Sequence, residues 1–167
     1  LKNYPDPTEM FDTHGSDAMR WYLCSSPILR GQDLSVDIKG KGIAEIVRLV
    51  IMPIWNAWSF FSMYARADGI SAEYKPAPAS NAPVLDRYIL AKTRELISGV
   101  TTAMDNYELS TACAEVRVFL DAFNNWYIRR SRGRFWSPVT GNAAVDAEKF
   151  SAYDTMYTVL HILTRTV

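Results

Sequence analysis

The sequence predicts a mainly helical protein, in which an antiparallel bundle of helices is preceded by a small α/β segment. Apolar residues make up 49% of the 167 residues and aromatic residues 13%, a composition typical of a chain that buries a core. Long stretches with apolar side chains every three or four residues are joined by short links, as in antiparallel helical bundles. The 18 basic and 18 acidic residues give zero net charge, so nucleic-acid binding would need a local basic cluster.

The first part of the chain carries the signals of short elements. Asp6 and Pro7 predict the start of a helix, because aspartate caps helix N-termini and proline fits the first helical turn. Ser16 is expected to cap a second helix, which ends before Pro27. Residues 33–38 alternate polar and apolar side chains, which predicts a short strand with one buried face.

A long helix is expected over residues 43–67, closed by Gly69 and kinked at Pro53. Its longest unbroken apolar run has only seven residues, whereas a membrane-spanning helix needs about 20 mostly apolar residues. We therefore interpret it as a buried helix of a soluble protein, with Asn56 hydrogen-bonded and the aromatic residues at 55–64 packed inside. The N-terminus lacks the apolar core of a signal peptide, so we expect a cytoplasmic protein.

Three prolines predict a surface connector over residues 70–83. Helices are then expected over residues 83–106, 110–132 and from about 146 to the last residue. The middle helix carries an apolar stripe formed by Cys113, Val116, Leu120, Phe123 and Tyr127, widened by Phe119 and Trp126.

The sequence offers little for catalysis or for metal binding. It contains no P-loop, GxGxxG, GxSxG or HExxH motif, so no catalytic residue is expected and the chain is interpreted as a binding module. Only two histidines occur, and no set of His, Cys and carboxylate residues has metal-ligand spacing, so no metal site is expected. The distant Cys24 and Cys113 predict two reduced, buried thiols.

The most distinctive feature is a basic and aromatic segment at residues 124–136, with four arginines in six residues. Guanidinium groups suit phosphates and the neighbouring aromatic rings suit base stacking, which favours anion or nucleic-acid binding. The alternative is a solvated or salt-bridged helix end, because the helix dipole favours arginines there. Lys39, Lys41 and Arg48 form a weaker cluster, which we interpret as ordinary surface charge.

Several segments resemble the isoleucyl-tRNA synthetases, which are class I enzymes. Residues 125–132 and 134–136 resemble part of their anticodon-binding domain, and residues 1–7 resemble the stretch that follows their KMSKS signature. Residues 14–23 are similar to the family's "YGADALRWYL", although His14 stands where the family usually has tyrosine, and residues 85–90 are similar to its "LDRWIL". The segments occur in the family's order.

The resemblance implies two parts: a stem-contact fold following KMSKS at residues 1–42, and an anticodon-binding helical bundle, truncated at its C-terminus, at residues 43–167. It implies a fragment of the enzyme that attaches isoleucine to its tRNA with ATP. The catalytic motifs are absent from the chain, so the fragment alone is expected to be inactive. The resemblance also implies that ATP, Mg and zinc belong to other parts of the parent enzyme, with no cofactor in this chain.

The implied partners are the tRNA for isoleucine and the catalytic and C-terminal domains of the parent chain, with no membrane and no DNA. The implied tRNA-binding residues are Asn125, Trp126, Arg129, Arg130, Arg132, Arg134 and Trp136. Two alternatives remain at this point: a fragment of a valine- or leucine-type synthetase, and a helical protein-interaction module that uses the arginine cluster.

Overall fold

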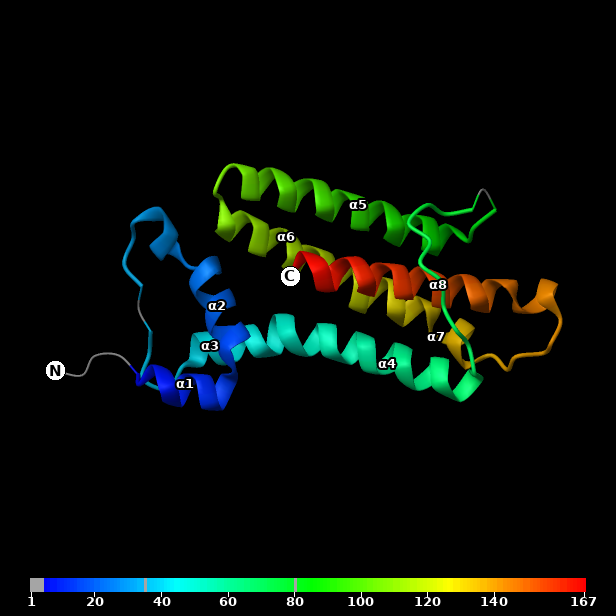
Figure 1. Ribbon diagram of the computed structural model, residues 1–167, viewed down its shortest axis with the longest axis horizontal. Coiled ribbons are helices and arrows are strands. Elements are labelled where there is room, and N and C mark those ends of the chain that lie inside the picture. The colour runs from blue at the N-terminus through cyan, green and yellow to red at the C-terminus, as the bar shows by residue number, and fades with distance from the viewer. Residues whose placement is uncertain (1–4, 35, 80) are drawn as a thin grey trace.

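The computed structural model describes residues 5–34, 36–79 and 81–167. In this part of the chain every regular element is helical, which confirms the mainly α fold class (Figure 1). A lead-in of short helices lies at one end of the molecule, and long helices lie alongside one another over the rest of it. The lead-in consists of α1 (Pro7–His14), α2 (Ser16–Ser25) and the short 3-10 turn η1 (Pro27–Arg30).

One of the two predicted helix caps in the lead-in is confirmed. A carboxylate oxygen of Asp6 accepts a hydrogen bond from the backbone N–H of Thr8 at 2.8 Å, so Asp6 caps α1 as expected. The prediction for Ser16 is wrong by one position, because Ser16 is already the first residue of α2. The capping position is Gly15, whose φ of 85° strains any residue with a side chain.

The strand predicted over residues 33–38 is not confirmed. Its described residues are irregular, and Ile38 is exposed to solvent rather than buried on a sheet face. Ser35 lies outside the described residues. A strand needs a partner to satisfy its backbone groups, and the described part of the chain offers none beside this segment.

The long helix runs without interruption from Lys41 to Asp68 and contains three elements: α3 (Lys41–Ile46), the π-helical turn η2 (Val47–Ile51) and α4 (Met52–Asp68). The π-turn lies just before Pro53, where the missing N–H and the ring of proline disturb the preceding turn. The predicted distortion of this helix therefore takes the form of a wider turn. Gly69 ends the helix as predicted, with a left-handed φ of 64°.

The expected burial of this helix is not confirmed. Trp55 is 60% exposed, Trp58 is 47% exposed, and Asn56 is exposed as well. Only part of the aromatic set packs inward: Phe60, Phe61 and Tyr64 lie against the core. Among the described residues, nothing covers one side of this apolar helix.

The described residues of the connector, 70–79 and 81–83, are irregular and cross α8 (Ala143–Thr166), as predicted for a proline-rich surface segment. Backbone N–H groups tie it down: Glu73 donates to Asp154 Oδ1 at 2.8 Å and Lys75 donates to Thr158 Oγ1 at 2.7 Å. The lysine side chain also reaches Asp154 Oδ2 at 2.6 Å.

The bundle is completed by α5 (Val84–Asp105), α8 and a continuous helix between them, made of α6 (Leu109–Asp121), the π-turn η3 (Ala122–Ile128) and α7 (Arg129–Trp136). In Figure 1, α5 and α6 form a hairpin, α8 lies across the α6–α7 helix, and α4 lies along the opposite side. The core is formed where α4, α5, η3 and α8 meet, and it is rich in large side chains.

The predicted apolar stripe of the α6–α7 helix is confirmed for every member but one. Cys113, Val116, Phe119, Leu120, Phe123 and Tyr127 are all buried. Phe119, Phe123 and Tyr127 stack in a row, with ring centroids 5.9 and 6.1 Å apart. Trp126 is the exception: it points outward and is 45% exposed.

Candidate nucleic-acid interface

The basic and aromatic segment, residues 124–136, covers most of η3 and all of α7, in a helix whose inner side is core. An α-helix turns about 100° per residue, so a row with a spacing of four drifts by about 40° at each step. The wider π-turn η3 offsets this drift, and the inner row Phe119, Phe123, Tyr127, Ser131 and Phe135 stays buried through four steps. Arg129, Arg130, Arg132 and Trp136 are thereby kept on the outer side.

Three of the four arginines lie on this outer side. Arg129, Arg130 and Arg132 are exposed, and within the described residues none of them has a carboxylate within 4.0 Å. The guanidinium carbon of Arg130 lies 4.0 Å from the ring centroid of Trp126, one helical turn away, which is a cation–π contact. The outer side therefore presents positive charge with open hydrogen-bond donors.

Both tryptophans of the segment are exposed, and each contacts one neighbouring side chain that fixes its position. Trp136 is 59% exposed, and its indole N–H donates to the hydroxyl of Tyr64 on α4 at 2.8 Å. Trp126 is held from one side by Arg130. Asn125 is exposed too, and its amide donates to Asp121 Oδ1 at 2.6 Å. Each ring keeps open surface that another flat group can cover.

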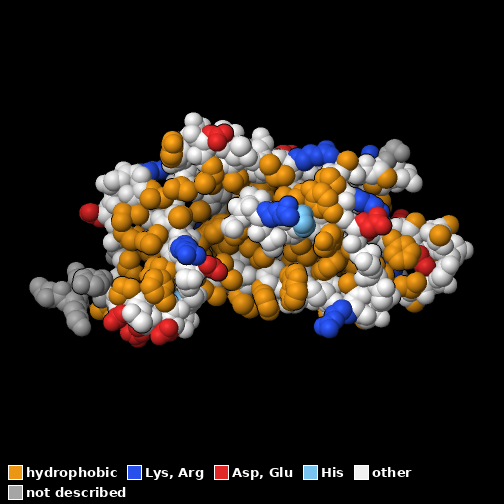
Figure 2. Space-filling view, viewed as in Figure 1, with side chains coloured by type: hydrophobic (Ala, Val, Ile, Leu, Met, Phe, Trp, Pro, Cys, Tyr) orange, Lys and Arg blue, Asp and Glu red, His pale blue; other side chains and the backbone are white. Residues whose placement is uncertain are grey.

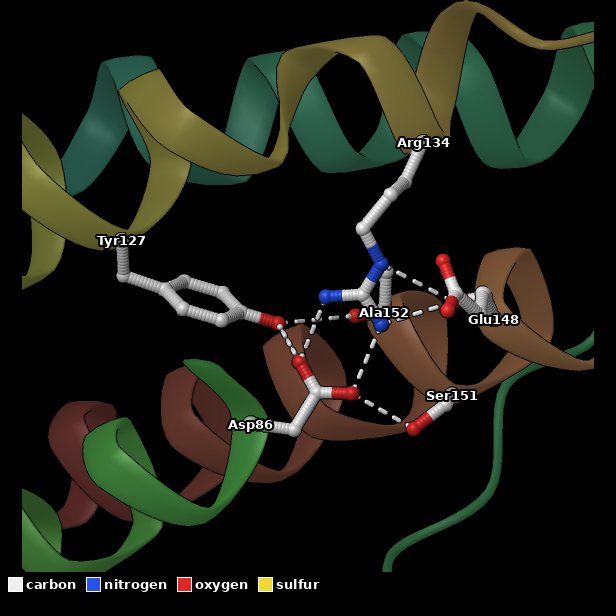
Figure 3. Close-up of polar contacts among 6 residues, drawn as sticks. All are labelled: Asp86, Tyr127, Arg134, Glu148, Ser151 and Ala152. Atoms are coloured by element: carbon white, nitrogen blue, oxygen red, sulfur yellow. Dashed lines mark hydrogen bonds and ion pairs between the residues drawn. The ribbon is translucent and has the colours of Figure 1, made fainter. Parts of the chain in front are cut away.

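Arg134 has a different environment from the other three arginines. It points inward from α7, and its side chain is only 14% exposed (Figure 3). It makes four hydrogen bonds: Nη1 and Nη2 donate to the two carboxylate oxygens of Asp86 at 2.7 Å each, and Nε and Nη2 donate to the backbone carbonyl of Glu148 at 3.1 and 2.7 Å. Its donors are engaged inside the protein, so the geometry assigns this guanidinium to the interior rather than to the predicted phosphate.

Asp86 is the centre of this buried network, and its side chain is 1% exposed. Besides the two bonds from Arg134, it accepts one from the hydroxyl of Tyr127 at 3.0 Å and one from Ser151 Oγ at 2.5 Å (Figure 3). A buried carboxylate is tolerated only when it is paired and hydrogen-bonded, and here both oxygens are satisfied. Burial, and then the negative charge of Asp86, raises the pKa of Tyr127 well above its usual value near 10, so the hydroxyl stays a donor.

A second buried cation holds the end of the same helix. The ammonium of Lys149 donates to the backbone carbonyls of Phe135 at 2.8 Å and Ser137 at 2.5 Å. It also pairs with Asp68 at 2.7 Å, at the C-terminal end of α4. The two buried cations, one on α7 and one on α8, thus tie the end of the Arg-bearing helix to its neighbours.

The network was missed from the sequence, although its members carry a signal. Asp86 falls on the apolar row of α5, with Ile89, Thr93 and Leu96, so it is placed inward. Tyr127, Ser131 and Arg134 have the i, i+4, i+7 spacing that shares one helix face. A carboxylate and an arginine that each continue an apolar stripe predict a buried pair.

The described residues contain no group of three or more His, Cys, Asp and Glu side chains that could hold a metal ion. Both cysteines are free thiols, with Cys113 buried and Cys24 partly buried. The chemistry that this surface offers is accordingly that of arginine donors and aromatic rings.

Comparisons with known proteins find a family model and several relatives that match this chain. Residues 86–167 match the family model described as the anticodon-binding domain of tRNA ligase. The chain is 52% identical over 165 residues to the isoleucine–tRNA ligase of Leifsonia xyli subsp. xyli, covering 99% of this chain and 14% of that protein. It is 48% identical to the isoleucine–tRNA ligase of Nocardia farcinica and 44% identical to that of Rickettsia felis, over 163 residues in each case, which is 98% of this chain and 14% of each relative.

The chain thus spans about a seventh of the length of these relatives. The similarity extends from the lead-in to the end of α8, so it includes the stretch before the matched family model as well. The chain belongs to the isoleucine–tRNA ligases, and its residues 86–167 are their anticodon-binding domain.

Proposed function

We propose that this chain docks the tRNA for isoleucine through the outer side of η3 and α7, as part of an enzyme that attaches isoleucine to that tRNA with ATP. The enzyme acts in the cytoplasm, and ATP, Mg and zinc are held by parts of it outside residues 1–167. The chain alone supplies RNA contacts and no catalytic group.

The observation that carries the proposal is a cluster of exposed arginines that have no carboxylate partner among the described residues. Arg129, Arg130 and Arg132 are exposed on one helix with no carboxylate partner among the described residues, in a protein of zero net charge. The alternative was a solvated or salt-bridged helix end. A salt-bridged end would have placed acidic side chains beside these arginines, and the salt series below distinguishes a merely solvated end from an RNA-binding one. Arginine forks bind phosphate oxygens with two parallel hydrogen bonds, and RNA offers phosphates at regular spacing.

The two tryptophans give the surface a second means of contact. Unpaired bases of RNA stack on exposed aromatic rings and on guanidinium planes. Trp126 with Arg130 above it, and Trp136 held by Tyr64, offer two such platforms. We therefore assign tRNA contact to Asn125, Trp126, Arg129, Arg130, Arg132 and Trp136, and leave Arg134 to the interior.

The test is the affinity for the isoleucine tRNA across a series of salt concentrations. Each arginine that neutralises a phosphate adds about 0.7 to 0.9 to the slope of log affinity against log salt, so replacing all three by Gln should remove about 2 to 3 units. The matched control removes three exposed arginines elsewhere: Arg87 on α5, Arg117 on α6 and Arg165 on α8. We expect the control to change the slope by less than half as much.

Competition separates RNA binding from a general attraction to acidic partners. Unlabelled tRNA should displace bound tRNA at lower phosphate concentration than heparin does. If heparin competes equally well, or if the triple variant and its control have the same slope, the surface is not an RNA-binding site. Preference for the valine or leucine tRNA over that for isoleucine would contradict the assigned substrate.

A further inference from the structure

An apolar groove lies on the face of the molecule shown in Figure 2, where α2, α4 and α6 meet the end of α8. Its volume is about 730 Å³. Hydrophobic side chains gather over this part of the face, and they include Trp21, Ile51, Ile54, Trp55, Trp58 and Val116. The groove lies apart from the buried network of Asp86, and none of its lining residues belongs to the segment assigned to tRNA.

The helix on one wall of the groove has the composition of a buried helix. Among the described residues, Lys41–Asp68 is the one helix long and apolar enough to cross a membrane, with a mean hydropathy of 1.3 over its most apolar 18 residues. Only 17% of that window is buried within the chain. A helix that is apolar around its circumference is stable in water only when neighbours cover it. The part of the chain that the structure describes leaves this cover incomplete.

The centre of the uncovered surface is a pair of tryptophans. The rings of Trp55 and Trp58 lie 5.3 Å apart with an angle of 37° between their planes, and both line the groove. Such aromatic side chains are the residues that most often dominate the binding energy of an interface. The charged side chains in the lining, Asp17 and Arg20, form an ion pair with each other at 3.4 Å. The other lining side chains are uncharged, which favours an uncharged partner.

The partner that fills the groove can be inferred from the apolar, uncharged lining and from the length of the relatives. This chain spans 14% of the Leifsonia xyli and Nocardia farcinica ligases, so most of each relative lies outside the matched region. We propose that the groove is an internal interface of the ligase, filled by an uncharged, apolar segment of the same polypeptide from outside residues 1–167. Trp55 and Trp58 are the anchors of this interface. A membrane is disfavoured because Glu45, Arg48 and Pro53 break up the apolar run of this helix.

The test compares the same substitutions in two proteins. Trp55→Glu with Trp58→Glu in this chain alone should change the thermal midpoint by no more than about 2 °C, because both side chains are already largely exposed. In the complete Leifsonia xyli ligase, Glu at the two aligned positions should lower the midpoint by at least about 4 °C, because it puts two charges into an apolar contact. Val118→Glu, on an exposed part of α6 outside the groove, is the control and should be harmless in both.

A second measurement does not depend on substitutions. Amide hydrogen exchange at residues 47–58 should be at least tenfold slower in the complete ligase than in the 167-residue chain, while exchange at residues 117–121 changes less. Equal exchange in both proteins, with harmless Glu substitutions in the ligase, would overturn the proposal. So would self-association of this chain, or its binding to phosphatidylcholine vesicles, if Trp55→Glu with Trp58→Glu abolished it and the ligase were unaffected.

Discussion

The guanidinium of Arg134 and the carboxylate of Asp86 form a bidentate ion pair, in which Nη1 and Nη2 each lie 2.7 Å from a carboxylate oxygen. The two residues are 48 positions apart in the sequence, and the pair joins α7 to the first turn of α5. Arg130, four residues earlier on the same continuous helix, is exposed and lies over the ring of Trp126. Two neighbouring arginines of one helix thus have opposite environments.

Replacing these two arginines should separate stability from RNA binding. Arg134→Gln leaves Asp86 buried without its cation and should lower the free energy of unfolding by about 3 to 5 kcal/mol. Arg130→Gln should change it by less than about 0.5 kcal/mol and should weaken tRNA binding instead. Urea unfolding followed by circular dichroism measures the first effect, and a binding titration measures the second.

Arg134→Lys is the informative control for this pair. Lysine keeps the positive charge but cannot form the bidentate hydrogen bonds to Asp86. The stability of the Arg134→Lys protein should therefore lie between those of the Arg134→Gln protein and the unaltered protein. If Arg134→Gln unfolded at the same urea concentration as the unaltered protein, the interior assignment of Arg134 would be wrong.

Stability should fall at alkaline pH because of buried tyrosines. Burial and the neighbouring Asp86 raise the pKa of Tyr127 in the folded protein, while in the unfolded chain it is near 10. Above about pH 10 the unfolded chain releases this proton and the folded protein keeps it, so unfolding is favoured by up to about 1.4 kcal/mol per pH unit. Tyr127→Phe should remove this part of the slope between about pH 10 and 11.

Tyr107→Phe provides the comparison, because Tyr107 is exposed at the tip of the α5–α6 hairpin. Chemical unfolding at several pH values gives the slope for each variant. A Tyr127→Phe protein with the same alkaline slope as Tyr107→Phe would show that Tyr127 ionises in the folded state.

At acidic pH, stability should depend on Asp146. This side chain accepts hydrogen bonds from the backbone N–H groups of Thr140 and Gly141 and from the Thr140 hydroxyl, and these bonds lower its pKa below the usual 3.8. The stabilisation is complete above this ordinary value, which holds in the unfolded chain, and is lost as the pH falls through the lower folded pKa. Asp146→Asn should therefore flatten the acid-unfolding curve below about pH 4.

Asp105→Asn, on an exposed residue at the end of α5, is the matched change for the acid measurement. Acid titration followed by circular dichroism compares the two variants. The assignment fails if Asp105→Asn flattens the curve as much as Asp146→Asn does.

The two thiols should react at different rates. Burial, and then the neighbouring Cys24, raises the pKa of Cys113 to about 11, which leaves roughly one thiolate in a thousand at pH 8. Cys113 is also buried, whereas Cys24 is partly exposed. With iodoacetamide at about pH 8, mass spectrometry should find Cys24 modified first, and both thiols modified after unfolding. Faster modification of Cys113 in the folded protein would contradict this structure of the α2–α6 contact.

The helices could be predicted from the sequence because their signals are local. Asp6 caps α1, Gly69 ends α4, and the buried stripe of α6 has the expected spacing, since each depends on neighbouring residues only. The predicted strand at residues 33–38 failed for the opposite reason. A strand depends on a partner elsewhere, and alternation of side chains alone cannot provide one.

The site was predictable only in part. That the segment is basic and aromatic can be read from the sequence, but which arginine turns inward depends on Asp86, on another helix. The same limit applies to Trp55 and Trp58, which were expected in the core and are exposed. Their apolar character was recognised correctly, but the described residues do not supply the cover that these side chains require.

The π-turn η3 holds one residue more than the corresponding α-helical turn, and it absorbs the rotation that this residue would otherwise impose. In a regular α-helix, one extra residue turns everything after it by about 100° and advances it by about 1.5 Å. If Ala122–Ile128 formed a regular α-helix of the same length, α7 would therefore rotate by about 100°. Arg134 would turn away from Asp86, and part of the exposed arginine cluster would turn toward the core. The wider turn thus sets which side of α7 faces solvent.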